Sequence, residues 1–229
     1  MNRILGVGLL SGMLMAATPE SFGGWATVTL LSVPEYLEVG TPTTLSFKIR
    51  QHGQTVLWDR EPTLIVGGGG LLARVLKWDR VPARKGEEWG VYEATITPKT
   101  PGELAITIDM DLYGLRAALH PFRVVAPESV PVRLSDAERG RQLFMAKGCA
   151  SCHAKLDDDP YAQFRWADFG PQLVARAFPV EYLRIKIKNP AELRTAEAAA
   201  IVMPKLELDV AEIESLARYL TGSAVVEGV

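Results

Sequence analysis

The chain has 229 residues, of which 48% are hydrophobic and 23% charged, enough apolar material for one large or two small domains. Its formal net charge is -2 and its isoelectric point about 6.0, which does not favour nucleic acid or an anionic membrane surface as a partner. Its 2 cysteines stand close together, at positions 149 and 152, so no framework of structural disulfides is predicted. Stability must therefore come from packing.

The N-terminus has the pattern of an export signal. Arg3 is followed by an apolar run from Ile4 to Ala17 and then by small and polar residues. The run is shorter than the roughly 20 residues that span a bilayer comfortably. We expect residues 1–21 to be a signal peptide and the protein to be periplasmic or otherwise extracytoplasmic. An uncleaved signal, or a partner complex, could instead hold it at a membrane.

Residues 22–126 alternate between apolar and polar positions in short runs that glycines and prolines separate. About seven short strands over roughly 100 residues predict an antiparallel β-sandwich of the immunoglobulin-like type. The glycines at 67–70 lack the lysine of a phosphate-binding loop and predict a flexible hairpin or loop. The expected strands are 25–33, 43–51, 55–58, 63–66, 71–78, 91–97, 103–111 and 120–125.

The predicted sandwich carries little that indicates chemistry. Its histidines are His52 and His120, with Met110 as a soft third candidate ligand, and a copper site would favour a cysteine as well. We expect both histidines at the surface or at strand ends. Residues 90–98 and 101–109 resemble a late hairpin of periplasmic immunoglobulin-like domains in the YtkA-like and FixH-like families. A binding or spacer module is therefore predicted.

A linker and a helical region follow. Two prolines stiffen residues 127–131, so the two domains should keep some mutual orientation. Within residues 132–229, a capping box at 135–138 begins one helix, and residues 209–212 open a second, amphipathic helix. Glycines end these helices at positions 148 and 222. Prolines frame a further helix at 179–190, although part of that segment alternates like a strand.

The most specific motif is Cys149-Ala150-Ser151-Cys152-His153, the pattern that attaches c-type haem. Residues three apart lie on one face of a helical turn, so both sulfurs can reach the two vinyl groups of one porphyrin. The next residue, His153, can then ligate the iron. A disulfide would close a very small loop, a zinc site would need further ligands, and a redox dithiol would need a βαβ context. One motif predicts one haem, bound through two thioethers.

Residues 132–222 resemble a single-haem class I cytochrome c domain. In that family the first and last helices cross at a small residue flanked by aromatics, which Gly140, Phe144 and Tyr219 match. Glycine at the crossing permits close backbone approach. The segment Phe169-Gly170-Pro171-Gln172-Leu173 matches the family's Gly-Pro-x-Leu segment.

The resemblance also implies how the haem is held. The carbonyl of Pro171 should accept the second N–H of His153, a bond that orients the ring. Val202-Met203-Pro204 matches the segment that supplies the sixth ligand, so the expected iron ligands are His153 and Met203. Arg165 and Trp166 are candidate donors to the haem propionates. The acidic run 157–159 is expected in a solvated loop.

His/Met ligation would leave no open position on the iron, which suits electron transfer rather than substrate chemistry. The sequence therefore predicts an exported one-electron carrier without catalytic residues, with a redox protein as donor and another as acceptor. Two alternatives stay open. The chain could be the haem-bearing subunit of a larger respiratory or oxidoreductase complex that docks through the sandwich. If Met203 does not ligate, it could be an open-site haem sensor or enzyme.

Overall fold

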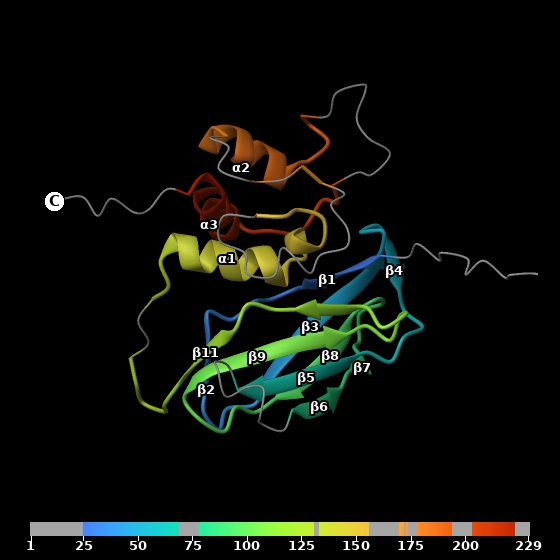
Figure 1. Cartoon of the computed structure of the whole chain (residues 1–229), viewed down its shortest axis with the longest axis vertical. Helices are drawn as coiled ribbons and strands as arrows, with labels where there is room; N and C mark the ends of the chain where they lie inside the picture. The colour runs from blue at the N-terminus through green and yellow to red at the C-terminus, as the bar shows by residue number, and fades with distance from the viewer. Residues whose placement is uncertain are drawn as a thin grey trace, which may run out of the picture.

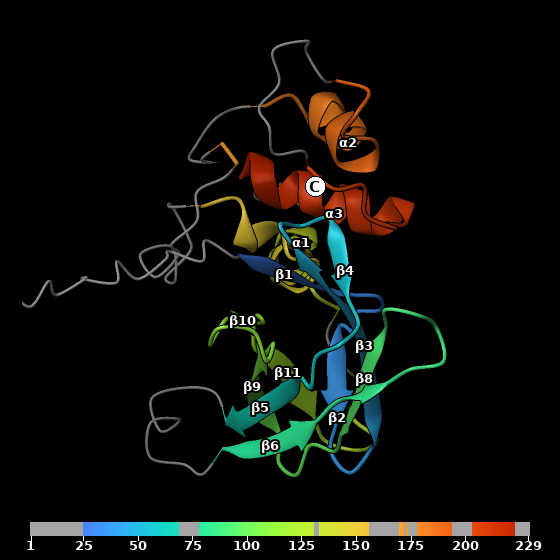
Figure 2. The same cartoon turned by 90° about the vertical axis from the view of Figure 1, so that its right-hand side faces the viewer.

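The computed structural model describes residues 25–68, 78–130, 133–155, 170–171, 173, 178–193 and 203–222. Strands occupy the first part of this chain and helices the second, as Figures 1 and 2 show. The predicted combination of a β-sandwich with an all-α domain is thus confirmed. The expected signal peptide and most of the strand expected at 71–78 lie outside the described residues.

The sandwich consists of two sheets that share one apolar core. One sheet has the strand order β1-β3-β8-β7, with β4 paired to β3, and the other has the order β2-β11-β9-β5-β6, with β10 paired to β9. The strand bounds are β1 Ala26–Leu30, β2 Tyr36–Glu38, β3 Thr43–Gln51, β4 Thr55–Leu57, β5 Thr63–Gly68, β6 Asp79–Pro82, β7 Arg84–Lys85, β8 Tyr92–Ile96, β9 Gly102–Asp109, β10 Arg116–Ala118 and β11 Phe122–Val125.

The strands pair antiparallel, as predicted, except that β11 runs parallel to β2. These two strands come from opposite ends of the sandwich sequence, so no tight turn forces them to be antiparallel. Along β3 the apolar residues Leu45, Phe47 and Ile49 are buried in the core. The residues between them face away from it, which is the period-two pattern that made this strand predictable.

The sequence did not indicate four of the strands, β2, β6, β7 and β10. They are two to four residues long, and β6 and β7 are mostly polar and lie at sheet edges. The glycines at 67–70 stand where the sequence predicted a flexible hairpin or loop, and the first two of them end β5, which pairs antiparallel with β6. The indole of Trp78 lies over Gly67, where an added Cβ would come within 2.7 Å of Trp78 Cδ2.

In the described part of the remaining chain the α-helices are α1 Asp136–Ala146, α2 Val180–Lys188 and α3 Val210–Thr221. The predicted capping box is present at Ser135, a second one is found at Asp209, and Gly222 ends α3 in the left-handed conformation with φ 67°. The strand-like segment before Asn189 is helical because Leu183 and Ile187, one helical turn apart, are both buried. Among the described residues, no helix has the length and apolarity to cross a bilayer.

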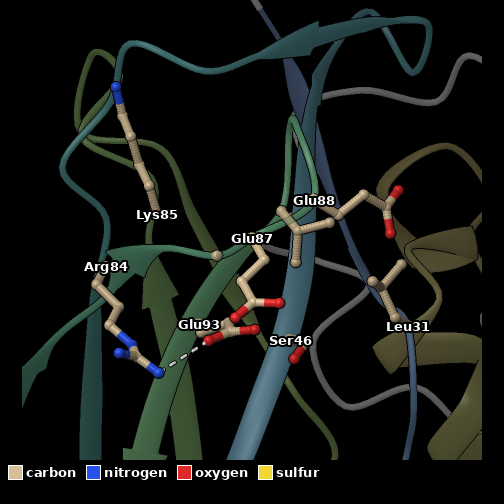
Figure 3. A pocket seen from close by; sticks show the side chains of 9 residues that line it. Leu31, Ser46, Arg84, Lys85, Glu87, Glu88 and Glu93 are labelled. Atoms are coloured by element: carbon tan, nitrogen blue, oxygen red, sulfur yellow. Dashed lines mark hydrogen bonds and ion pairs between the residues drawn. The ribbon is translucent and has the colours of Figure 1, made fainter.

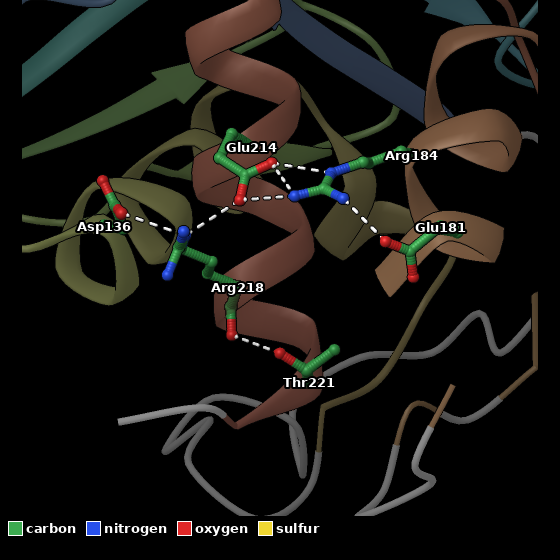
Figure 4. Close-up of polar contacts among 6 residues, drawn as sticks. All are labelled: Asp136, Glu181, Arg184, Glu214, Arg218 and Thr221. Atoms are coloured by element: carbon green, nitrogen blue, oxygen red, sulfur yellow. Dashed lines mark hydrogen bonds and ion pairs between the residues drawn. The ribbon is translucent and has the colours of Figure 1, made fainter. Parts of the chain in front are cut away.

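An ion-pair network joins the three helices (Figure 4). Arg184 of α2 donates two hydrogen bonds to the carboxylate of Glu214 of α3, with N–O distances of 2.8 and 2.9 Å. Arg218, one turn further along α3, pairs with Glu214 at 2.9 Å and with Asp136 of α1 at 3.1 Å. The network therefore orients α2, which has few other ties to α1.

We expect this network to give the helical domain an acid-dependent stability. The hydrogen bond from Arg184 is the main cause that lowers the pKa of Glu214, against a smaller opposing effect of burial. A lowered folded-state pKa means that the contribution is complete above the unfolded value, near 4.5, and disappears as the pH falls through the folded value. Glu214→Gln should lower the free energy of unfolding by about 1 kcal/mol at neutral pH. In this variant the free energy of unfolding should then fall less steeply as the pH decreases. Denaturant unfolding over that pH range measures both effects.

Glu88→Gln is the matched control, because it removes an ion pair with Lys48 on the sandwich surface. It should leave the acid dependence of the helical domain unchanged. An acid decline of equal steepness in Glu214→Gln and in the unaltered chain would contradict the role given to Glu214.

Candidate functional site

The Cys-x-x-Cys-His motif forms one tight turn directly after α1. Lys147 is the C-cap of the helix, and Gly148 turns the chain with φ 84°, a conformation that favours glycine. The carbonyl oxygen of Cys149 then accepts hydrogen bonds from the backbone N–H groups of Cys152, at 3.1 Å, and His153, at 2.9 Å. Both sulfurs and the imidazole therefore leave the chain within a single turn.

The two thiols are free and stabilised in the neutral form. Burial raises the pKa of Cys149 to about 12, and the neighbouring Cys152 adds to the rise. Burial also raises the pKa of Cys152 to about 11. A reactive redox dithiol needs a thiolate with a lowered pKa. The burial of the two thiols therefore does not favour a redox dithiol and suits two sulfurs that face an apolar group.

The His153 ring is oriented by a backbone carbonyl. Its Nδ1 lies 3.1 Å from the carbonyl oxygen of Pro171, which can only accept, so Nδ1 donates this hydrogen bond. Two further hydrogen bonds hold the Pro171 segment beside the motif, from Gly170 N–H to the Cys152 oxygen at 2.7 Å and from Leu173 N–H to the Ala154 oxygen at 2.8 Å. The contact implied by the family resemblance is thus present in the structure.

Gly170 shapes the space for the same ring. A Cβ added at Gly170 would lie 2.9 Å from His153 Nε2 and closer still to Cε1 and Nδ1. Any larger residue would therefore displace the imidazole. The glycine allows the backbone to pack against the ring, while the carbonyl of the next residue holds the proton on Nδ1.

The helix crossing that supports the site has the predicted residues. An added Cβ at Gly140 of α1 would overlap the backbone oxygen of Ser215 and lie 2.5 Å from Tyr219 Cβ, both on α3. The rings of Phe144 and Tyr219 stack at a tilt of 58°, with their centroids 5.6 Å apart. The close crossing of α1 and α3 therefore depends on the absence of a side chain at Gly140.

Met203 is half-buried and begins the segment that leads into α3 at its N-cap, Asp209. The residues before it, including Val202, lie outside the described residues, as do Arg165, Trp166, Phe169, Gln172 and the acidic run 157–159. The assignments of Met203 as a ligand and of Arg165 and Trp166 as propionate donors remain predictions.

Two lysines near the motif are buried, which the sequence did not predict. Lys147, with 2% of its side chain exposed, pairs with Glu212 of α3 at 2.9 Å. Lys155, on the other side of the motif, is also buried and lies over the ring of Tyr219, with its Nζ 4.9 Å from the centroid. In the sequence Lys147 is an ordinary helix-ending lysine, and Lys155 has no pattern around it.

The sandwich has no comparable site in its described part. His52 lies in the β3–β4 turn, His120 in the loop before β11, and Met110 in the core. A surface hollow of about 410 Å³ is lined by three glutamates (Figure 3), but Glu88 pairs with Lys48 and Glu93 with Arg84. The described residues include no cluster of histidine, cysteine and carboxylate side chains suited to a metal ion.

The described residues fit a covalently attached haem: two thiols on one turn, an imidazole that a backbone carbonyl orients through Nδ1, and a glycine that makes room for the ring. With a glycine at the crossing of the first and last helices, they define a domain of the c-type cytochrome class. The comparison with protein families agrees, because residues 137–223 match the family model of cytochrome c. The C-terminal part of the chain is therefore a cytochrome c domain.

Other comparisons add little. No curated protein matches the chain. Among solved structures, the chain is similar to the ZirS C-terminal domain, at 15% identity over 55% of this chain and 85% of that one, with a TM-score of 0.34. A CARDB domain from Pyrococcus furiosus in complex with di-metal ions matches at 16% identity over 45% of this chain and 94% of that one, with a TM-score of 0.30. A superoxide reductase (neelaredoxin) from Ignicoccus hospitalis matches at 20% identity over 43% of this chain and 80% of that one, with a TM-score of 0.29. Likeness at this level carries no argument about function.

Proposed function

We propose that the chain is an exported one-electron carrier with a single haem, bound through thioethers at Cys149 and Cys152 and ligated by His153 and Met203. The observation that carries this proposal is the hydrogen bond from His153 Nδ1 to the Pro171 oxygen, at 3.1 Å. A carbonyl partner on one ring nitrogen is the typical support of a metal-ligating histidine, because it orients the other nitrogen and makes it a better donor.

Each residue of the proposed haem site then has a defined role. Pro171 keeps the proton on Nδ1, and Gly170 fixes the position of the ring. The close crossing of α1 and α3 holds the turn that carries both thiols. Met203 would supply a thioether from the segment before α3. The bound haem supplies the one-electron couple, and ligation by both side chains would leave little to rearrange when one electron is gained or lost.

The location and the partners belong to the same proposal. The export pattern of residues 1–21 and the need to attach haem covalently both favour an extracytoplasmic location. Donor and acceptor would be redox proteins, since the described residues include no cluster that suggests chemistry on a substrate. Copurification with a larger assembly would favour the role of a complex subunit.

The absorption spectrum of the exported protein, oxidised and reduced, tests the proposal. We expect covalent haem and, in the oxidised protein, a weak far-red sulfur-to-iron band that disappears in Met203→Ala. Met145→Ala, which changes the methionine on α1, is the matched control and should keep the band. A high-spin or carbon-monoxide-reactive spectrum would instead favour the open-site sensor or enzyme, and a chain without covalent haem would exclude all haem-based functions.

A further inference from the structure

The sandwich touches the helical domain at the residues just before the attachment motif. The C-terminal half of α1 lies over β1 in both views (Figures 1 and 2). Lys147 donates from Nζ to the Leu31 oxygen at 3.0 Å, and its own carbonyl accepts from Thr29 Oγ1 at 3.4 Å. At Gly148, which directly precedes Cys149, an added Cβ would lie 2.5 Å from the Val28 oxygen. The backbone of β1 therefore packs against the start of the motif.

The contact between the helical domain and residues 27–35, which we call the seam, continues along α1. Arg139 donates to the Val33 oxygen at 2.7 Å, and Gln142 donates to the Glu35 oxygen at 3.4 Å. These carbonyls, like that of Leu31, lie in the segment that follows β1, the edge strand of its sheet. Side chains of the helical domain therefore satisfy backbone oxygens just beyond this strand.

A second contact reaches the segment after Met203. The ring of Pro204 lies beside the β3–β4 turn, 4.0 Å from the position that a Cβ of Gly53 would occupy. The guanidinium of Arg50, on β3, is close enough to Glu207 for that carboxylate to raise its pKa, against a larger lowering by burial. The sandwich thus packs against the residue before Cys149 and lies near the residue after Met203.

Burial on the outer face of the sheet marks the extent of the contact. Thr27 and Thr29 of β1 are only 5% and 6% exposed, although they point away from the sandwich core. Thr95 of β8 lies on the same outer face, as its register with β3 shows, and is exposed. The polar face is therefore buried where the helical domain covers it and exposed where it does not.

Building on the proposed function, we propose that the β-sandwich is a fixed wall of the haem site. It packs against Gly148 and lies near Pro204, in the two segments that would hold the haem, and excludes water and partner proteins from that side. Redox partners then approach over the part of the cytochrome c domain that the sandwich leaves open. The sandwich is in this way part of the redox centre rather than a spacer joined to it by a linker.

The test uses Thr29→Arg in the complete exported holoprotein, with Thr95→Arg as the matched control. Both threonines lie on the outer face of one sheet, which already carries Lys48 and Arg50, so the sandwich can accommodate either arginine. Hydrogen exchange at residues 26–30 and 143–149 reports the seam. The reduction rate with ascorbate and the reduction potential report access of water to the site. The far-red band reports ligation.

We expect Thr29→Arg to speed exchange at the seam, to raise the rate of reduction by ascorbate severalfold and to lower the potential, while the far-red band persists. Thr95→Arg should change none of these. If hydrogen exchange at the seam rises but the rate of reduction by ascorbate and the reduction potential stay constant, the sandwich does not shield the haem site. Unchanged exchange would overturn the proposal too, because it would mean that the seam is not packed in solution.

If Thr29→Arg does not yield folded holoprotein, Arg139→Ala opens the other end of the seam by removing the hydrogen bond to Val33, and the same outcomes apply. Failure of the proposed function can be told apart from failure of this inference. In the first case the unaltered protein would lack covalent haem or the far-red band, whatever the state of the seam.

Discussion

Gly140→Ala should destabilise the cytochrome c domain by about 2 kcal/mol. Alanine is the better helix former, by about 1 kcal/mol, so propensity alone predicts a gain. However, the added Cβ would overlap the Ser215 oxygen and crowd Tyr219 Cβ, and the first of these is backbone that cannot rotate away. Overpacking of this kind costs up to about 3 kcal/mol. Denaturant unfolding followed by haem absorbance and by helical circular dichroism measures the net loss.

The control for Gly140→Ala is Gly86→Ala in the sandwich. There the added Cβ would meet only the side chain of Glu93, at 3.1 Å, and this flexible chain can move aside. We expect a change within about 0.5 kcal/mol, typical of surface substitutions. Equal effects of the two variants would contradict the view that the helix crossing requires glycine.

Lys147→Met should cost about 3 kcal/mol and weaken the coupling between the two domains. The ammonium is 2% exposed and lies between Glu212 Oε1, at 2.9 Å, and the Leu31 oxygen, at 3.0 Å. Methionine keeps the length of the side chain but leaves the Glu212 carboxylate, itself only 14% exposed, without its cation. Removing one partner of a buried ion pair costs about 3–5 kcal/mol, and the partial exposure of Glu212 favours the lower value.

Lys99→Met is the matched control, since Lys99 is 81% exposed and pairs with Asp79 at the sandwich surface. An exposed pair contributes at most about 1 kcal/mol. Combining Lys147→Met with Glu212→Gln in a double-mutant cycle isolates the coupling between the two side chains. A cost for Lys147→Met no larger than that for Lys99→Met would show that the contacts of Lys147 with Glu212 and with the Leu31 oxygen add no more stability than a surface pair.

Local signals account for what the sequence predicted well. The capping boxes at Ser135 and Asp209 rest on hydrogen bonds between residues three apart, and the alternation along β3 rests on a period of two. The strands that were missed have no such signal. The segment Asp79–Pro82 is polar and short, and becomes a strand because β5 offers it an edge to pair with.

The chemistry of the site lies mostly within one turn of chain, which is why the sequence by itself determined it: Cys149, Cys152 and His153 need only local hydrogen bonds to act together. The tertiary structure decided what surrounds that turn. Thr27 and Thr29 resemble a solvated strand face, and Lys147 resembles a solvated helix end. All three are buried because two domains meet there, across contacts such as that of Thr29 with Lys147, 118 residues apart. Periodicity and spacing encode what a residue does within its own element, whereas the partner of an exposed face depends on shape and packing over the whole chain.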